Sequence, residues 1–404
     1  MSTATAGGAA SLPLPLSDVK IIAIEQYGAG PFGTQHLADL GAEVIKVENH
    51  HDSGDVGRAV GPHYFGPGDS HFYQSFNRNK KSITLDLKQT DGQAVLHRLT
   101  QDADVVFNNL RGDLPVKLGL TYEALKAFNP KIVCGHLSAY GRTGSRAAWP
   151  GYDYLMQAEA GYLSLTGEPD GPPARMGLSI IDLMTGTTAA MGLLAGVIGA
   201  RATGQGRDVD VSLFDVALHN LAYVATWYLN GGTAIRRQTR SSHPSLTPSQ
   251  LYRTQDGWIF LMCNKEKFWG VFAREVGRPE WATDHAYQSF ANRLANRDQL
   301  TADVDALLQT ATTAEWMNRL AGKVPVAPVY DVAQALDSDF VAEQERLLEF
   351  AHTSGPVRMV ASPVRAGNHP LRPAPAMGEH TDEILLAAGY DQADIRRLRA
   401  QSVL

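Results

Sequence analysis

Short apolar segments alternate with helical segments through the first half of the chain, and this alternation constrains the fold more than any other feature. Five segments have the length and composition of buried strands: VKIIAIE (19–25), EVIKVE (43–48), SITLDL (82–87), DVVFNN (104–109) and KIVCGHLS (131–138). Helical patterns lie between and after them, at 34–41, 91–101, 121–128 and 183–200. Continuous apolar strands separated by helices are typical of a parallel sheet covered on both faces. The sequence therefore predicts an α/β fold here.

A change of composition toward Gly, Arg, Ser and Pro between Asn230 and Pro248 predicts a domain boundary. The following segment, LYRTQDGWIFLMC, predicts a β-hairpin because Asp256–Gly257 is a strong turn signal. Helical patterns continue at 265–276, 298–309 and 313–321, and segment 323–332 is predicted to lead back to the first domain. The predicted organisation is a flexible tail (1–17), a large domain with a parallel sheet (18–224 and 326–404) and a smaller α+β domain (225–325).

The overall charge of the chain indicates which kinds of binding partner are unfavourable. The chain has 404 residues, a net charge of −6 and an isoelectric point near 6.1, which argues against nucleic acid or an anionic membrane as the main partner. Its first residues, MSTATAGGAASLPLPL, lack the basic start and apolar core of a signal peptide, so we expect a cytoplasmic protein.

The cysteine and histidine content offers little for a metal or a disulfide framework. The two cysteines, Cys134 and Cys263, lie in apolar runs and are expected to be buried small side chains. The cluster His50–His51–Asp52 consists of adjacent residues on a predicted surface loop, and we interpret it as solvated. No metal site is predicted.

A glycine motif raises the possibility of dinucleotide binding. Residues 28–33 read Gly-Ala-Gly-Pro-Phe-Gly after a predicted strand and before a predicted helix, and Glu48 ends the next strand. This spacing matches the G-x-G-x-x-G pattern, in which glycines approach a pyrophosphate and an acid binds the ribose. However, Gln26 and Tyr27 separate the strand from the first glycine. An NAD- or FAD-binding oxidoreductase is therefore one alternative.

Asp182 occupies a position where an aspartate has two interpretations. It ends the segment GYLSLTGEPDGPPARMGLSIID (161–182) and directly precedes the apolar helical pattern from Leu183 to Ala200. An aspartate at the start of a helix is favoured by the free N–H groups and the dipole there. It is either a helix N-cap or a functional carboxylate, and position alone leaves both open.

Several ordered segments together resemble class III CoA-transferases, the superfamily that includes formyl-CoA transferase, carnitine CoA-transferase and α-methylacyl-CoA racemase. The segments that carry the resemblance are GAGPFGTQHLADLGAEVIKVENHHDSGDVGR, FNRNKKSITLDLK, VFNNLRGDLPVKLGL, PGYDYLMQAEAG, the Gly-Pro-Pro segment before Asp182, HPSLTPSQLYRTQDG and MGEHTDEILLAAG. The resemblance implies a Rossmann-like large domain that binds coenzyme A, and an interlocked homodimer. It also implies a transferase of a sulfur-containing group, with no metal or redox cofactor.

The resemblance also assigns roles to residues. Asp182 is implied as the nucleophile, which forms an aspartyl anhydride and then an aspartyl–CoA thioester. Asp153 matches a second active-site acid that is a glutamate in formyl-CoA transferase, and the N–H groups around Gly28 are expected to hold the oxyanion. One family arginine is replaced by Asn49. The residues implied to contact coenzyme A are Gln26, Tyr27, Ala29, Asn79, Lys80, Lys81, Asn109, Leu110 and Lys117.

Two reaction classes within the resemblance remain open, and the transferase is favoured. The racemases have Gly-His-Asp where this chain has Gly151–Tyr152–Asp153, and they use a further histidine that is missing between Arg98 and Gly135. In the segment RRQTRSSHPSLTP (236–248), arginine forks match a distal carboxylate or sulfinate. We therefore expect succinyl-CoA as donor and a dicarboxylate or sulfinate-bearing acid as acceptor, with four residues as candidate substrate contacts: Arg236, Arg237, Arg240 and His243.

Overall fold

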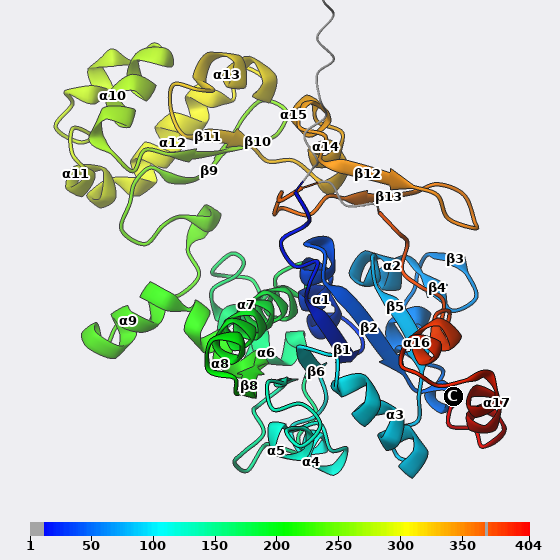
Figure 1. Ribbon diagram of the computed structural model, residues 1–404. Helices are drawn as coiled ribbons and strands as arrows, with labels where there is room; N and C mark the ends of the chain where they lie inside the picture. Colours follow the sequence, from blue (N-terminus) through cyan, green and yellow to red (C-terminus); the bar gives the residue numbers. More distant parts are fainter. Residues whose placement is uncertain (1–11, 368–370) are drawn as a thin grey trace, which may run out of the picture. The chain divides into compact units, whose positions relative to one another are not determined.

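The computed structural model describes residues 12–367 and 371–404, and Figure 1 shows their arrangement. Most of the predicted tail, residues 1–11, lies outside the described residues. The described residues form two compact units, the first comprising 12–160, 177–221, 346–367 and 371–404 and the second 161–176 and 222–345. The second unit is thus larger than the predicted small domain. Segment 161–176 joins it because Arg237 Nη1 donates hydrogen bonds to the carbonyls of Gly171 (2.6 Å) and Pro172 (2.7 Å).

The first unit is built on a six-stranded sheet in the order β5-β2-β1-β6-β7-β8, and every adjacent pair is parallel. This confirms the predicted α/β fold with a parallel sheet. The side chains of its central strands are almost all buried, which explains why they are apolar along their length. The strands are β1 (Lys20–Ile24), β2 (Glu43–Glu48), β5 (Lys81–Thr84), β6 (Val105–Asn108), β7 (Val133–Ser138) and β8 (Arg207–Ser212).

Helices cover both faces of this sheet (Figure 1). On one face lie α1 (Ala29–Asp39) and α7 (Ile180–Thr203), and Leu193 of α7 reaches Gly135 of β7. The other face carries a continuous apolar core shared with α3 (Thr90–Thr100), α5 (Tyr122–Leu125), α16 (Thr381–Ala387) and α17 (Gln392–Ala400). Within the described part of the chain, α7 alone is long and apolar enough to cross a bilayer, and 44% of its apolar stretch is buried inside the fold.

Helices α1 and α7 approach each other so closely that their glycines leave no room for side chains. A Cβ on Gly33 would lie 2.5 Å from the carbonyl oxygen of Gly186, and a Cβ on Gly186 would lie 2.4 Å from that of Ala29. Contacts this short do not occur between real atoms, so both positions require glycine. The close approach fixes the start of α1 against the start of α7.

Shorter elements complete the first unit. They are β3 (Tyr64–Gly66), β4 (Asp69–Ser70), α2 (His71–Asn77), α4 (Leu114–Lys117), α6 (Asp153–Glu159), α8 (Leu213–Asn220), and the hairpin of β12 (Leu347–Phe350) and β13 (Val357–Val360). Helix α8 begins directly after β8 because the Ser212 hydroxyl accepts a hydrogen bond from the Asp215 amide (3.0 Å), which caps the helix.

The second unit has an antiparallel sheet in the order β11-β10-β9. Its strands are β9 (Ser249–Arg253), β10 (Trp258–Met262) and β11 (Val326–Pro328), and the turn at Asp256–Gly257 is the one predicted from the sequence. Trp269, Phe272 and Trp316 are buried in its core. The helices are α9 (Ala222–Gly231), α10 (Glu266–Glu275), α11 (Phe290–Ala295), α12 (Arg297–Leu308), α13 (Thr313–Leu320), α14 (Val332–Leu336) and α15 (Asp339–Glu343).

Candidate active site

The candidate site lies where the strand order of the parallel sheet reverses. Strand β1 has β2 on one side and β6 on the other, and ligands of open parallel sheets bind at the carboxyl ends of strands at such a point. The residues that follow β1 and β6, Gln26 and Asn109, both line a hollow of about 180 Å³. We call it the Asp182 hollow, because the Asp182 carboxylate is part of its wall. Its other lining residues include Tyr27, Gly28, Ala29, Trp149, Pro150, Gly151 and Tyr152.

Asp182 lies in the first turn of α7, and its neighbour Asp153 lies in the first turn of α6. The two acids are linked, because Asp153 Oδ2 accepts a hydrogen bond from the Asp182 backbone N–H (2.9 Å). Gln157 Nε2 holds the other oxygen of Asp153 at 2.6 Å. Ser179 is the N-cap position of α7, so the interpretation of Asp182 as the N-cap is wrong. The Asp182 carboxylate therefore has no capping role in its own helix.

The surroundings of Asp182 favour its neutral form. Burial, with a smaller contribution from the Asp153 carboxylate, raises the pKa of the Asp182 carboxyl to about 7. The residue is only 7% exposed. Near neutral pH this carboxyl is therefore partly ionised, poorly hydrated and more basic than an ordinary aspartate. These are properties of a nucleophile or a general base.

The starts of α1 and α7 lie at this carboxylate, and the Asp153 side chain links the start of α6 to that of α7. Helix α1 begins after Gly28, α6 begins at Asp153, and Asp182 itself is in the first turn of α7. A Cβ on Gly28 would lie 3.1 Å from Asp182 Oδ2, so the absence of a side chain lets the start of α1 approach the carboxylate. Free backbone N–H groups at helix N-termini stabilise negative charge. The arrangement is suited to a reaction in which negative charge develops on an oxygen beside Asp182.

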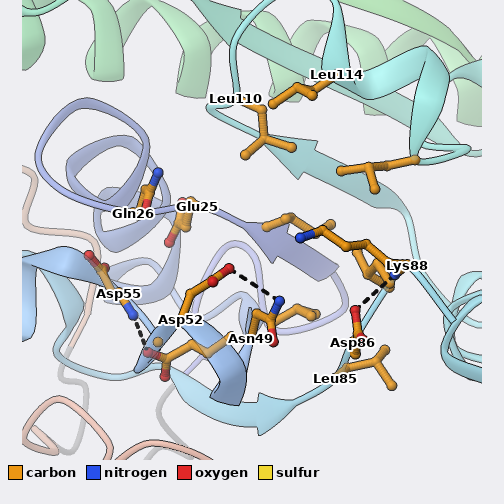
Figure 2. Close-up of a pocket in the computed structure, with 16 residues that line it drawn as sticks. Glu25, Gln26, Asn49, Asp52, Asp55, Leu85, Asp86, Lys88, Leu110 and Leu114 are labelled. Atoms are coloured by element: carbon orange, nitrogen blue, oxygen red, sulfur yellow. Dashed lines mark hydrogen bonds between the residues drawn. The ribbon is translucent and has the colours of Figure 1, made fainter. Parts of the chain in front are cut away.

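A larger hollow adjoins the Asp182 hollow and shares Gln26 and Leu110 with it. Its volume is about 360 Å³, and we call it the Lys88 hollow. Figure 2 shows apolar side chains on one side, Leu110 and Leu114, and polar ones on the other: Asn49, Asp52 and Asp86. Among the described residues that line it, Lys88 is the one cation.

Most residues of the Lys88 hollow were not among the site residues predicted from the sequence. Its wall includes the segment Leu85–Lys88 directly after β5 and the segment around Asn49 directly after β2. The signal that identifies them is their place after a strand, because the carboxyl ends of parallel strands meet at one edge of the sheet.

The predicted basic turn does not line either hollow. Lys81 begins β5 and so lies at the opposite end of that strand, where it contacts Glu43 and Glu383 (2.8 Å each). The Asn79 side chain donates a hydrogen bond to Asp39 (2.8 Å). Lys80 is fully buried and is bonded to Glu25 (2.7 Å). The turn therefore supports the fold rather than presenting cations to a ligand.

The remaining predicted contacts are divided between the site and other surfaces. Leu110 lines both hollows, whereas Lys117 is 64% exposed and paired with Asp113 (2.6 Å). The Arg237 contacts described above and the ion pair between Arg240 and Asp305 (2.5 Å) lie within the second unit. Arg236 and His243 also belong to the second unit.

The structure does not support dinucleotide binding by the glycine motif. Gly33 is required by the contact between α1 and α7, and a Cβ on Gly30 would lie 2.9 Å from the Asn109 side chain. Glu48, the predicted ribose ligand, is buried and bonded to Arg58 (2.7 Å) and Ser82 (2.6 Å). The motif thus serves packing, and its acid is committed to an internal ion pair.

Three other chemistries lack support at this site. Burial raises the pKa of the Cys134 thiol well above its usual range, which makes it an unreactive core residue. Among the described residues, no group of histidines, cysteines and acids is arranged to hold a metal ion. The part of the Asp182 hollow that the structure describes contains no histidine to serve as a racemase base.

Comparison with known proteins identifies the family. Residues 16–381 match the model of CoA-transferase family III. The succinate–glutarate CoA-transferase of Agrobacterium fabrum is 33% identical over 392 residues, which cover 92% of this chain and 95% of that protein. The acetyl-CoA:oxalate CoA-transferase of Acetobacter aceti is 34% identical over 360 residues, covering 88% and 90%.

Solved structures agree with this assignment. A CaiB/BaiF family protein from Brucella suis superimposes with a TM-score of 0.81 at 31% identity, covering 93% of this chain and all of that one. The chain therefore belongs to CoA-transferase family III, as the resemblance in its sequence predicted. The alternative of a nicotinamide or flavin oxidoreductase is wrong, because the family model matches nearly the whole chain, including the glycine motif.

Proposed function

We propose that the protein is a homodimeric CoA-transferase that moves coenzyme A from succinyl-CoA to a small dicarboxylic acid, with Asp182 as the nucleophile. The observation that carries the proposal is a buried, basic carboxylate in the first turn of α7 and beside the start of α1. Such a carboxylate can be acylated, and the adjoining N–H groups can hold the oxyanion of the tetrahedral intermediate.

The reaction divides into acyl exchanges that each break one bond and form one. An oxygen of Asp182 attacks the thioester carbon of succinyl-CoA, and the C–S bond breaks to give an aspartyl–succinyl anhydride and the CoA thiolate. The thiolate then attacks the Asp182 carboxyl carbon, which releases succinate and leaves an aspartyl–CoA thioester. The acceptor carboxylate attacks this thioester, and the displaced thiolate completes the transfer by attacking the acceptor acyl carbon. Asp182 is regenerated, and nothing is oxidised or reduced.

The two adjoining hollows fit the two ends of the donor. The acyl group and thioester belong beside Asp182, and the nucleotide of coenzyme A belongs in the Lys88 hollow, whose leucines offer an apolar face to the adenine. The Lys88 side chain is exposed, and its charge suits a phosphate group. Asn49 stands where the resemblance places an arginine, so Lys88 is the main candidate for the phosphate contact within this hollow.

The names of the relatives support a dicarboxylate acceptor. Besides glutarate and oxalate, they include D-citramalate, for a Chloroflexus aurantiacus transferase that is 34% identical over 403 residues and covers 97% of this chain.

Intact-mass measurement tests the proposal directly. Mixed with succinyl-CoA alone, the protein is expected to gain the mass of one CoA less one water, as an aspartyl–CoA thioester that hydroxylamine cleaves. Glutarate is expected to convert this adduct to glutaryl-CoA. No adduct and no product with succinyl-CoA or acetyl-CoA would overturn the proposal. An adduct without glutaryl-CoA would retain the transferase and reject this acceptor. Solvent deuterium at the α-carbon of a 2-methylacyl-CoA, without an adduct, would favour the racemase. Light scattering on the same sample tests the homodimer.

The pH profile tests the state of Asp182. Because its pKa is raised to about 7, the fraction of the reactive carboxylate falls as the pH drops below that value. We expect kcat/KM for succinyl-CoA to be constant above pH ~8 and to fall about tenfold per pH unit below pH ~6. Asp153→Asn keeps an oxygen for the Asp182 N–H and removes the neighbouring charge, so its profile should shift to lower pH. A flat wild-type profile between pH 5 and 8 would contradict this assignment.

A further inference from the structure

The loop between β1 and α1 has a strained backbone that its own sequence does not explain. Tyr27 has φ = +67°, a left-handed conformation that side chains other than glycine rarely adopt. Such a residue persists only where its surroundings impose the conformation. The residue that follows it is Gly28, which faces Asp182. The contacts that hold Tyr27 in this conformation therefore also set the distance between the start of α1 and the nucleophile.

Two side chains from other parts of the fold hold this loop. On one side, Asn109 accepts a hydrogen bond from the Gln26 N–H (2.9 Å) and donates one to the Gln26 carbonyl (2.7 Å). On the other side, Asp55 Oδ1 accepts a hydrogen bond from the Tyr27 N–H (2.8 Å). Asn109 follows β6 in the wall of the Asp182 hollow, whereas Asp55 comes from the loop after β2 and lines the Lys88 hollow instead.

Asp55 is in turn fixed by a buried lysine. Lys46 Nζ lies 2.7 Å from Asp55 Oδ2 and donates a hydrogen bond to the carbonyl of Glu25 (2.9 Å). The side chains of Lys46 and Asp55 are both completely buried. Burial lowers the pKa of Lys46, but Asp55, Glu25 and Glu48 together outweigh it and keep the ammonium charged. One ammonium therefore holds both ends of the segment from Glu25 to Tyr27, directly at Glu25 and through Asp55 at Tyr27.

We propose that Lys46 and Asp55 are positioning residues for catalysis, which hold the Tyr27–Gly28 peptide and the start of α1 against Asp182. This inference rests on the proposed transferase function, and it adds residues that contact neither the Asp182 carboxylate nor the reacting atoms. The geometry requires a carboxylate at position 55, because one oxygen must accept from Tyr27 while the other faces an ammonium. An asparagine offers only one acceptor, so it must present its NH₂ group to a donor on one side or the other.

The ion pair of Arg78 and Asp39 provides a matched control. It is also buried, with Arg78 Nη2 2.6 Å from Asp39 Oδ2, but Asp39 ends α1, at the opposite end of that helix from Gly28. Asp39→Asn weakens a buried pair of the same kind without touching the loop. A general loss of stability should therefore affect both variants, and a loss of positioning should affect only Asp55→Asn.

The test compares Asp55→Asn, Asp39→Asn and the double variant Lys46→Met/Asp55→Asn. For each, active sites are counted by the amount of aspartyl–CoA adduct, and kcat and KM are measured with succinyl-CoA and glutarate. We expect Asp55→Asn to lower kcat per active site about 10- to 100-fold, a larger change than that in the KM for succinyl-CoA. Its pH profile should keep the inflection near pH ~7, because that pKa belongs to Asp182. In the double variant no ammonium opposes the amide, so part of the kcat should return.

Four outcomes separate the possibilities. If the wild-type protein forms neither adduct nor product, both the proposed function and this inference are wrong. An active wild type, together with an Asp55→Asn variant of unchanged kcat per active site, would overturn the inference alone. Equal losses of kcat in Asp55→Asn and Asp39→Asn would show a structural role and also overturn it. A kcat loss confined to Asp55→Asn, with partial recovery in the double variant, supports it.

Discussion

Asp182→Asn is expected to abolish CoA transfer, lowering kcat by at least about 10⁴-fold, the scale on which enzymes lose a nucleophile. The amide has the shape of the carboxylate and occupies the same first turn of α7. It lacks the anionic oxygen that attacks the thioester, so neither the anhydride nor the aspartyl–CoA thioester forms. The measurements are the rate of glutaryl-CoA formation and the intact mass after exposure to succinyl-CoA, which should show no adduct.

The same substitution is expected to leave the fold intact and to make it less sensitive to pH. The pKa of Asp182 is raised on folding, so the folded state holds this proton more strongly than the unfolded chain does. Stability from this group is present below pH ~4 and is lost as the pH rises through about 7. Asp182→Asn cannot ionise, so it does not lose stability as the pH rises. The melting temperature of the variant should therefore exceed that of the wild type at pH 8 and match it at pH 4. An inactive variant that melts earlier at pH 8 would contradict this explanation.

Two controls complete the experiment. Asp170→Asn changes an exposed aspartate outside both hollows and should keep full activity. Asp182→Ala cannot regain an aspartate by slow deamidation, so it distinguishes true residual turnover from a small fraction of reverted protein. Turnover above 1% of wild type in Asp182→Ala would show that another residue is the nucleophile.

The architecture could be predicted well from the sequence because the strands of a parallel sheet are buried on both faces and are therefore apolar along their length. Each of the five predicted strands is present, and Asp182 lies at the start of the helix that the apolar pattern indicated. The segment 161–176 was placed in the wrong unit, because its anchoring depends on Arg237, which is more than sixty residues away in the chain. Such contacts leave no periodic pattern.

The site was harder to predict than the fold, for a related reason. Lys80 and Lys81 are charged residues on a turn, and sequence alone does not show which charges already have partners. In the fold both lysines form ion pairs: Lys80 with Glu25, and Lys81 with Glu43 and Glu383. Lys88 carries the same charge only a few residues later, but it follows the carboxyl end of β5 and so lines the hollow. What distinguishes Lys88 from Lys80 and Lys81 is its position after the carboxyl end of the strand, not its charge.

Gly33→Ala is expected to destabilise the protein strongly, because a Cβ there would lie 2.5 Å from the backbone carbonyl of Gly186. Overpacking of a buried contact costs typically 1–3 kcal/mol, and alanine regains about 1 kcal/mol through its higher helix propensity. A backbone carbonyl cannot move aside as a flexible side chain can, so the upper end applies and we expect a net loss of about 2 kcal/mol. Thermal unfolding should show a melting temperature lower by about 5 °C.

The effect should extend to activity, because α1 and α7 bring Gly28 and Asp182 together. Separating the helices at Gly33 and Gly186 moves the N–H groups of α1 away from the carboxylate, and kcat should fall more than KM changes. Gly66→Ala is the control, since no atom lies within 4 Å of a Cβ there. If Gly33→Ala melts like Gly66→Ala, the two helices are not in backbone contact. The glycines of the G-x-G-x-x-G pattern would then need an explanation other than the contact between α1 and α7.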